Sequence, residues 1–215
     1  DFIVPTGNFG DIFAAYVAKK MGLTINKLVI ASNQNDILHR TLESGVYRKK
    51  GLQHTVSPSM DIQVASNFER LLFELYERET ELVQNAMDGL ATDGLFKLAS
   101  GPLEKFREDF LSGSVSEDMT YKTIKRALND YGELVCPHTA VGLAVADKLY
   151  QNNCVVSRVT LATAHPAKFP TSVKDCTNVA PRLPERYEDL FKKSETCLSI
   201  KNNFSDVKKI ISERI

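Results

Sequence analysis

A five-residue stretch near the start of the chain has the composition of an anion-binding loop. Gly7-Asn8-Phe9-Gly10-Asp11 follows an apolar run and leads into residues whose apolar positions recur at helical spacing. Because glycine and, less readily, asparagine tolerate positive φ, successive N–H groups could turn inward as a concave nest. The positive end of the following helix would add to the attraction for a phosphate. We expect Asp11 to cap this helix, since its carboxylate would repel a phosphate if it pointed inward.

Several loop classes share glycines at this spacing, and the neighbouring residues separate them. No Gly-Lys-Ser/Thr follows, as it would in a nucleoside-triphosphate loop, and the G-x-G-x-x-G dinucleotide pattern is absent. A G-x-x-G loop that clamps nucleic acid joins two helices, whereas this loop follows a strand-like run. A strand-to-helix turn without a ligand is the remaining alternative to a phosphate site.

The composition argues against several kinds of partner. Lys and Arg number 27 and Asp and Glu number 27, so no positive excess favours nucleic acid or an anionic membrane. The four cysteines have no Cys-x-x-Cys spacing and form no metal-ligand set, which favours reduced thiols in a cytoplasmic protein. No apolar run is long enough to span a bilayer. We therefore expect no nucleic-acid, membrane or metal partner.

Three apolar runs predict the strands that would position the loop. Residues 1–5, 27–31 and 154–163 are continuous apolar segments, as in parallel strands buried on both faces. Helical spacing elsewhere predicts an α/β fold with a helical insertion over about 66–135. Residues 45–65 show no periodicity and are expected to form a loop.

Capping residues and periodicity predict the helices. Ser66 and Glu69 have the spacing of a capping box that begins one long amphipathic helix reaching residue 90. Further helices are expected at residues 11–21, 118–131 and 136–150, with two short ones near 185–193 and 204–213.

Five blocks of sequence occur between residues 4 and 169, in the order VPTGNFGD, ASNQNDIL, SPSMDIQVASNFERLLFEL, CPHTAVG and LATAHPAKF. In these blocks the chain closely resembles the threonine synthase family of fold-type II pyridoxal-phosphate (PLP) enzymes. The resemblance implies a three-layer α/β fold with a mostly parallel sheet, similar to that of the tryptophan synthase β subunit. It also implies that residues 1–215 are the C-terminal, PLP-phosphate-binding part of such an enzyme.

The resemblance assigns roles to individual residues. Gly7, Asn8, Phe9 and Gly10 match the tetrapeptide that cradles the 5′-phosphate of PLP, and Thr163 matches the hydroxyl beside the pyridine nitrogen. In the family, the Schiff-base lysine lies in a Phe-Lys-Asp context on the N-terminal side of this loop. That context is absent from the sequence. We therefore expect no catalytic residue in this chain, and expect the N-terminal part of the enzyme to be a missing partner.

Other polar residues are candidates for substrate contacts. Asn33 and Asp36 follow a predicted parallel strand, where sites of α/β proteins form, although Asp36 could instead cap a helix. Lys168 could hold a substrate phosphate or be solvated. Further side chains that could approach the site are Asn35, Ser57, Ser59, Asp61, His138 and His165.

The activity implied by the resemblance is the conversion of O-phospho-L-homoserine and water to L-threonine and phosphate, a step of threonine biosynthesis. Three alternatives remain open at this point. One is a threonine-synthase-like phospho-lyase that does not make threonine, and another is a non-catalytic relative that binds PLP or phosphate. The third is a different fold-type II lyase, such as one that acts on phosphoserine-like substrates.

Overall fold

The computed structural model describes residues 1–151 and 156–214. The chain divides into two compact units, Asp1–Pro181 and Arg182–Ile215, which are described separately below. Among the described helices, none has both the length and the apolar character that crossing a membrane would require.

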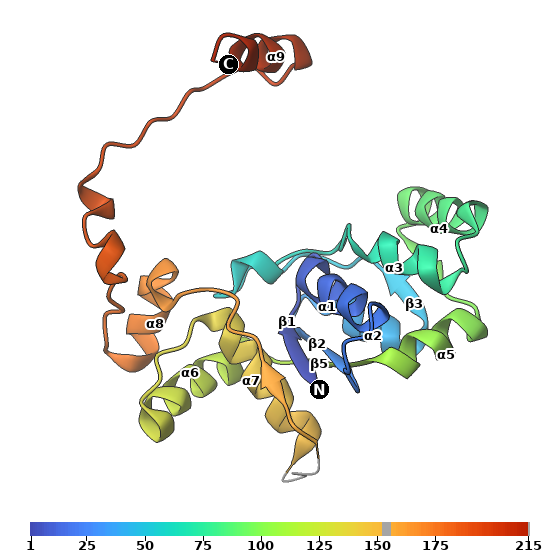
Figure 1. Cartoon of the computed structure of the whole chain (residues 1–215), viewed down its shortest axis with the longest axis horizontal. Coiled ribbons are helices and arrows are strands. Elements are labelled where there is room, and N and C mark those ends of the chain that lie inside the picture. Colours follow the sequence, from blue (N-terminus) through green and yellow to red (C-terminus); the bar gives the residue numbers. More distant parts are fainter. Residues whose placement is uncertain (152–155, 215) are drawn as a thin grey trace. The chain divides into compact units, whose positions relative to one another are not determined.

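A four-stranded parallel sheet forms the centre of the larger unit (Figure 1). Its strands are β1 (Phe2–Pro5), β2 (Leu28–Ser32), β5 (Phe110–Ser114) and β6 (Val159–Thr160), in the order β5-β2-β1-β6. Each neighbouring pair is parallel, and β1 pairs with β2 from Phe2 opposite Leu28 to Pro5 opposite Ala31. The predicted α/β fold with a parallel sheet is confirmed.

Alternate residues of the two central strands enter separate hydrophobic cores. Val4, Leu28 and Ile30 belong to the larger core, whereas Ile3 and Val29 belong to the smaller one. Helix α7 (Pro137–Tyr150) packs on the strands and contributes to the smaller core. Because both faces are covered, these strands read as continuous apolar runs, and the unit has three layers.

The helices of the larger unit surround this sheet. They are α1 (Gly10–Lys20), α2 (Ile37–Ser44), α3 (Phe68–Leu75), α4 (Thr80–Thr92), α5 (Ser100–Asp109), α6 (Glu117–Tyr131), α7 and α8 (Pro170–Thr177). The helices predicted at 11–21, 118–131 and 136–150 are confirmed within one residue at each end. Gly132 ends α6 with φ 71°, a left-handed conformation that suits glycine.

The long helix predicted to reach residue 90 is two helices, α3 and α4. Glu77 and Arg78 separate them, with φ 55° and 70°. The predicted capping box is wrong: Asn67 precedes α3 and makes no side-chain cap, while the Ser66 hydroxyl lies 2.9 Å from Asn8 Oδ1. A tertiary contact with the loop has replaced the local cap.

Three strands were absent from the prediction. The range 66–135 contains β4 (Leu95–Lys97) and the sheet strand β5, and the range 45–65 contains β3 (Val46–Arg48), which pairs antiparallel with β4. Strand β5 reads FLSGS, in which a glycine and two serines hide the apolar pattern. The range 66–135 is therefore not helical throughout.

The strand predicted at 154–163 is shorter than expected. Residues 154 and 155 lie outside the described part of the chain, and β6 comprises only Val159 and Thr160. Val159 is 45% exposed, because β6 is the edge strand next to β1 rather than a buried central strand.

The smaller unit contains the 3-10 turns η3 (Glu185–Tyr187) and η4 (Leu190–Lys192) and the helix α9 (Phe204–Ser212). The helix predicted near 204–213 is confirmed, and the one predicted near 185–193 is instead the two turns. None of the described residues from 182 to 214 is buried.

Candidate functional site

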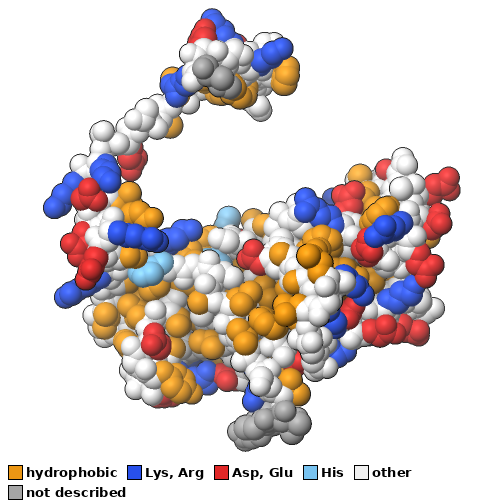
Figure 2. All heavy atoms as spheres, viewed as in Figure 1, with side chains coloured by type: hydrophobic (Ala, Val, Ile, Leu, Met, Phe, Trp, Pro, Cys, Tyr) orange, Lys and Arg blue, Asp and Glu red, His pale blue; other side chains and the backbone are white. Residues whose placement is uncertain are grey.

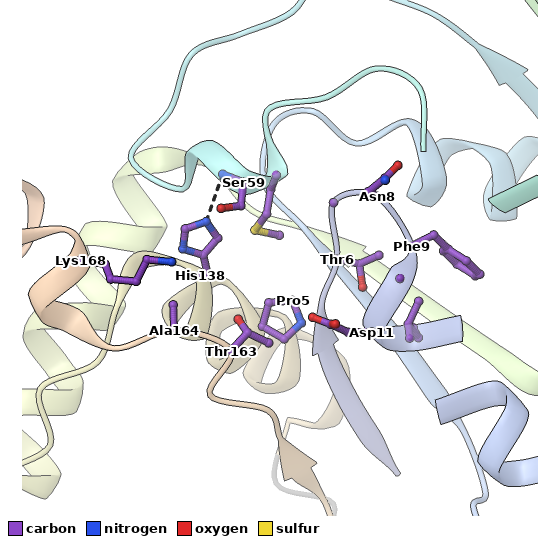
Figure 3. A pocket seen from close by; sticks show the side chains of 14 residues that line it. Pro5, Thr6, Asn8, Phe9, Asp11, Ser59, His138, Thr163, Ala164 and Lys168 are labelled. Carbon is purple, nitrogen blue, oxygen red and sulfur yellow. Dashed lines mark hydrogen bonds between the residues drawn. The ribbon is translucent and has the colours of Figure 1, made fainter. Parts of the chain in front are cut away.

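A cavity of about 300 Å³ lies where β1 ends and α1 begins (Figure 3). Several segments far apart in the sequence contribute to its wall. The lining residues are Pro5, Thr6, Gly7, Asn8, Phe9, Gly10, Asp11, Ile12, Ser59, Met60, His138, Thr163, Ala164 and Lys168. The structure therefore brings the predicted loop together with Thr163 and Lys168.

The loop that lines this cavity has unpaired backbone amides. Among the described residues, no protein acceptor takes up the N–H groups of residues 7–12, and the first helical bond of α1 runs from the amide of Phe13 to the carbonyl of Phe9. The first turn of a helix leaves such donors free, and the helix dipole makes them attractive to an anion. The geometry fits a phosphate group at residues 7–12.

The conformation of the loop differs from the expected one. The residue with positive φ is Phe9, at 65°, whereas neither Gly7 nor Gly10 adopts it. Because Phe9 takes the left-handed position, α1 starts at Gly10 and Asp11 is its second residue. The predicted capping role of Asp11 is therefore wrong, and its carboxylate lines the cavity instead, where its negative charge opposes the attraction of the amides for a phosphate.

The side chain of Phe9 explains how the loop keeps a conformation that disfavours a bulky residue. It is fully buried, and its ring centroid lies 5.3 Å from that of Phe68 and 5.8 Å from that of Phe110. In Figure 3 this ring points away from the cavity. Aromatic packing behind the loop thus offsets the backbone strain in front of it.

Asn8 ties the loop to the segment before α3. Its Oδ1 accepts the amide of Ser66 at 2.5 Å, and its carbonyl accepts the Asn67 side-chain amide at 3.0 Å. The side-chain oxygen of Asn8 is therefore occupied by protein contacts, whereas its backbone N–H has no protein acceptor among the described residues.

Gly7 is required by a close approach rather than by its backbone angle. A Cβ at this position would lie 2.3 Å from the carbonyl oxygen of Ser59, in the turn η1 (Pro58–Met60). Gly10 is different, because a Cβ there would meet only the side-chain amide of Asn67, at 3.5 Å. Only the first of the two glycines is sterically indispensable.

His138 enters the cavity wall from the first turn of α7. It is 4% exposed, its Nε2 accepts the amide of Ser59 at 3.2 Å, and its ring lies 4.7 Å from that of Phe169. Burial, and then the positive charge of Lys168, lower the pKa of His138 to about 4, while Asp61 opposes this shift. The imidazole is therefore neutral near pH 7.

Thr163 and Lys168 come from the segment that follows β6. Thr163 lies three residues beyond the end of that strand, so its hydroxyl projects from a loop rather than from a strand end. In Figure 3 the amine end of Lys168 points toward His138. His165 is not part of the wall, and its Nδ1 accepts the amide of Ala167 at 3.2 Å.

Asn33 does not line the cavity, and it belongs to a buried network. Its side-chain amide donates to Asp61 Oδ1 at 2.8 Å and to Ser57 Oγ at 2.9 Å. Asn35 also donates to Asp61, at 3.0 Å, and Asp61 Oδ2 accepts the amide of Thr55 at 2.7 Å. These bonds fasten residues 53–61 to the end of β2. The substrate contact suggested for Asn33 stays a prediction.

Asp36 also lies outside the cavity. It occupies the N-cap position of α2 without making a side-chain cap, and its Oδ1 accepts the Arg40 Nε at 2.7 Å. Its suggested substrate contact likewise stays a prediction.

Sequence reasoning missed some members of the wall. Pro5, Thr6 and Met60 carry no chemical pattern that would single them out, and the Thr6 hydroxyl is already bound to the carbonyl of Val4 at 2.6 Å. Within the described residues, no group of three or more His, Cys, Asp and Glu side chains could hold a metal ion.

Comparison with known proteins identifies relatives of this chain. The family model described as "Threonine synthase, C-terminal" matches residues 139–211. Threonine synthase of Pseudomonas aeruginosa is 42% identical over 213 residues, which cover 99% of this chain and 45% of that protein. Human threonine synthase-like 1 is 35% identical over 181 residues, covering 83% of this chain and 24% of that protein.

A solved structure has a similar fold. The crystal structure of PLP-bound threonine synthase from Brucella melitensis superposes with a TM-score of 0.90 and 47% identity, covering 99% of this chain and 45% of that one. The chain spans about half the length of the threonine synthases it matches. On sequence and fold together, it belongs to the threonine synthase family and corresponds to the C-terminal region of its members.

Proposed function

We propose that this chain supplies the PLP-phosphate-binding half of a threonine synthase acting in the cytoplasm. The complete enzyme would convert O-phospho-L-homoserine and water to L-threonine and phosphate. The observation that carries the proposal is the set of unpaired amides of residues 7–12 at the wall of the cavity. A phosphate there would accept hydrogen bonds from main-chain donors that nothing else in the described chain satisfies.

The residues of the cavity divide the proposed work of holding the cofactor. The backbone of Gly7, Asn8, Phe9 and Gly10 would bind the phosphate, and the Thr163 hydroxyl would bond the pyridine nitrogen. Because a hydroxyl is neutral, it does not force a proton onto that nitrogen. PLP itself would supply the electron sink for proton removal next to the amino group. Lys168 is a proposed contact for the substrate phosphate, as a flexible point charge.

The proton-transferring lysine is proposed to belong to the remaining half of the enzyme. The cavity wall contains one lysine, Lys168, and it follows the loop in sequence rather than preceding it. We therefore expect this chain by itself to bind PLP without turning over O-phospho-L-homoserine.

A second candidate is favoured by the similarity to human threonine synthase-like 1. A relative of this kind could keep the phosphate loop and use another phosphorylated amino acid, or only bind the ligand. The two candidates differ in product, so release of threonine and phosphate from O-phospho-L-homoserine by the reassembled enzyme would separate them.

A pair of substitutions at one position tests the phosphate loop. Gly10→Asp places a negative charge among the amides and should weaken PLP binding by at least about tenfold, as one lost charge-assisted hydrogen bond would. Gly10→Ala is the matched control, because its Cβ meets the Asn67 amide at an ordinary 3.5 Å. Equilibrium dialysis of PLP against both variants measures the difference. Equal PLP affinities of the two variants would refute a phosphate site at this loop.

A further inference from the structure

His138 is linked to the loop through one backbone segment. The hydrogen bond from the Ser59 amide to its Nε2, at 3.2 Å, requires an unprotonated Nε2, so the neutral ring carries its proton on Nδ1. Among the described residues Nδ1 has no hydrogen-bond partner. Among the described residues, the imidazole therefore forms its hydrogen bond with the turn η1.

The same turn rests against the loop. The Ser59 carbonyl oxygen and the Met60 Cα would lie 2.3 and 3.1 Å from a Cβ on Gly7, so backbone meets backbone with no side chain between them. A displacement of η1 would therefore be transmitted to Gly7. The ring of Phe169 also packs near the imidazole, with ring centroids 4.7 Å apart.

The charges around His138 favour the acceptor form. Lys168, from the segment after β6, disfavours protonation, and Asp61, from the segment after η1, favours it less strongly. With its pKa lowered to about 4, the ring accepts the Ser59 amide near neutral pH. A protonated ring would turn an N–H toward an N–H and lose the bond.

We propose that His138 is a positioning residue for the phosphate loop: its Nε2 holds the Ser59 amide, and the turn η1 thereby holds the Gly7 backbone in its binding position. The inference rests on the proposed function, because the ligand of the loop is there the PLP phosphate. His138 needs no contact with that ligand to act.

Two substitutions separate the acceptor from the volume of the ring. His138→Leu fills the space without an acceptor, whereas the side chain introduced by His138→Gln can place an amide oxygen near the position of Nε2. His39→Gln is the control, because His39 is a partly buried histidine bonded to Ser112 at 2.8 Å and does not line the cavity. The whole 215-residue chain is used for each variant.

PLP affinity near neutral pH is the first measurement. His138→Leu should weaken binding about tenfold, as expected for one buried hydrogen bond to a backbone amide. His138→Gln should stay within about threefold of the parent chain, and His39→Gln should equal it. Equal binding by parent and His138→Leu, or equal losses in both His138 variants, would overturn the proposal.

Hydrogen exchange of the Ser59 amide is the second measurement, and it needs no cofactor. The amide should be protected in the parent chain and in His138→Gln and should exchange quickly in His138→Leu, with a shifted Gly7 amide resonance. An unshifted Gly7 resonance would overturn the link between turn and loop. If the parent chain failed to bind PLP, the proposed function would fall, while the exchange data would still decide the role of His138.

Discussion

Gly7 and Phe9 meet two different demands on the loop, whereas the sequence pattern suggested that glycine and asparagine would supply its positive φ angles. Gly7 permits the contact with Ser59, and Phe9 provides the left-handed turn while its ring is buried against Phe68. The positive φ at a bulky aromatic residue costs about 1–3 kcal/mol, which the surrounding packing must offset. The loop is thus shaped both by the turn in front of it and by the core behind it.

Gly7→Ala should be more damaging than its small size suggests. The new Cβ meets a backbone oxygen that cannot rotate away, and overpacking of this kind costs about 1–3 kcal/mol of unfolding free energy. Urea unfolding should show this loss for Gly7→Ala and little change for Gly10→Ala. Similar stability of the two variants would contradict the close approach.

At the scale of elements, residues 53–61 are held to the sheet by side chains rather than by regular structure. Asp61 accepts bonds from Asn33, Asn35 and Thr55, and these contacts set where η1 begins. The position of η1 relative to the loop therefore depends on a polar network that does not itself line the cavity.

Removal of the Asp61 carboxylate tests this anchoring. Asp61→Ala leaves the Thr55 amide without its acceptor and removes one acceptor each from Asn33 and Asn35, so it should lower the unfolding free energy by about 1–3 kcal/mol. Asp61→Asn keeps one oxygen acceptor and should lose less. Limited proteolysis should cut within the exposed residues 49–54 faster in Asp61→Ala than in the parent chain. Unaltered cleavage would indicate that another contact holds the segment.

The elements that could be predicted from sequence are those whose pattern is local. The strand of residues 1–5 and the helices at 118–131 and 136–150 combine apolar spacing with Pro or Gly boundaries, and the structure contains all three. Strand β5 could not be found, because Ser112 and Gly113 break its apolar run and its identity depends on pairing with β2. The break between α3 and α4 likewise depends on backbone conformations at Glu77 and Arg78 that periodicity does not encode.

The residues of the candidate site also divide into those that local sequence predicts and those that tertiary contacts decide. The loop of residues 7–10 and its neighbours Thr163 and Lys168 were found through sequence blocks, and all of them line the cavity. Asn33 and Asp36 follow a strand in the sequence, but the direction of a side chain at a strand end is decided by its tertiary partners, here Asp61 and Arg40.

At the scale of the whole molecule, the two units contribute unequally to the candidate site. All residues of the cavity lie within Asp1–Pro181, and the described part of the smaller unit contains no buried residue.

Figure 2 shows hydrophobic side chains spread over the visible surface of the protein. Exposed large apolar residues include Met21 and Tyr131, at 83% and 73%.

A chain that ends at Pro181 should therefore retain the fold and the site of the larger unit. We expect a thermal midpoint within about 2 °C of the parent, because none of the described residues from 182 to 214 is itself buried. PLP affinity should be equal in the two chains. Calorimetry and dialysis provide the comparison, and a fall in the midpoint of more than about 5 °C would reveal stabilising contacts from the smaller unit.

The packing of the Phe9 ring couples the conformation of the loop to the stability of the larger hydrophobic core. A mutation at Phe68 or Phe110 that slackens the aromatic cluster would let residue 9 relax toward an ordinary backbone angle, although neither residue lines the cavity. Gentle heating would have the same effect, so the affinity of the loop for an anion should fall at temperatures below the cooperative unfolding transition. In screens for heat-tolerant variants, loss of bound cofactor on heating would then indicate that the packing of the core has loosened.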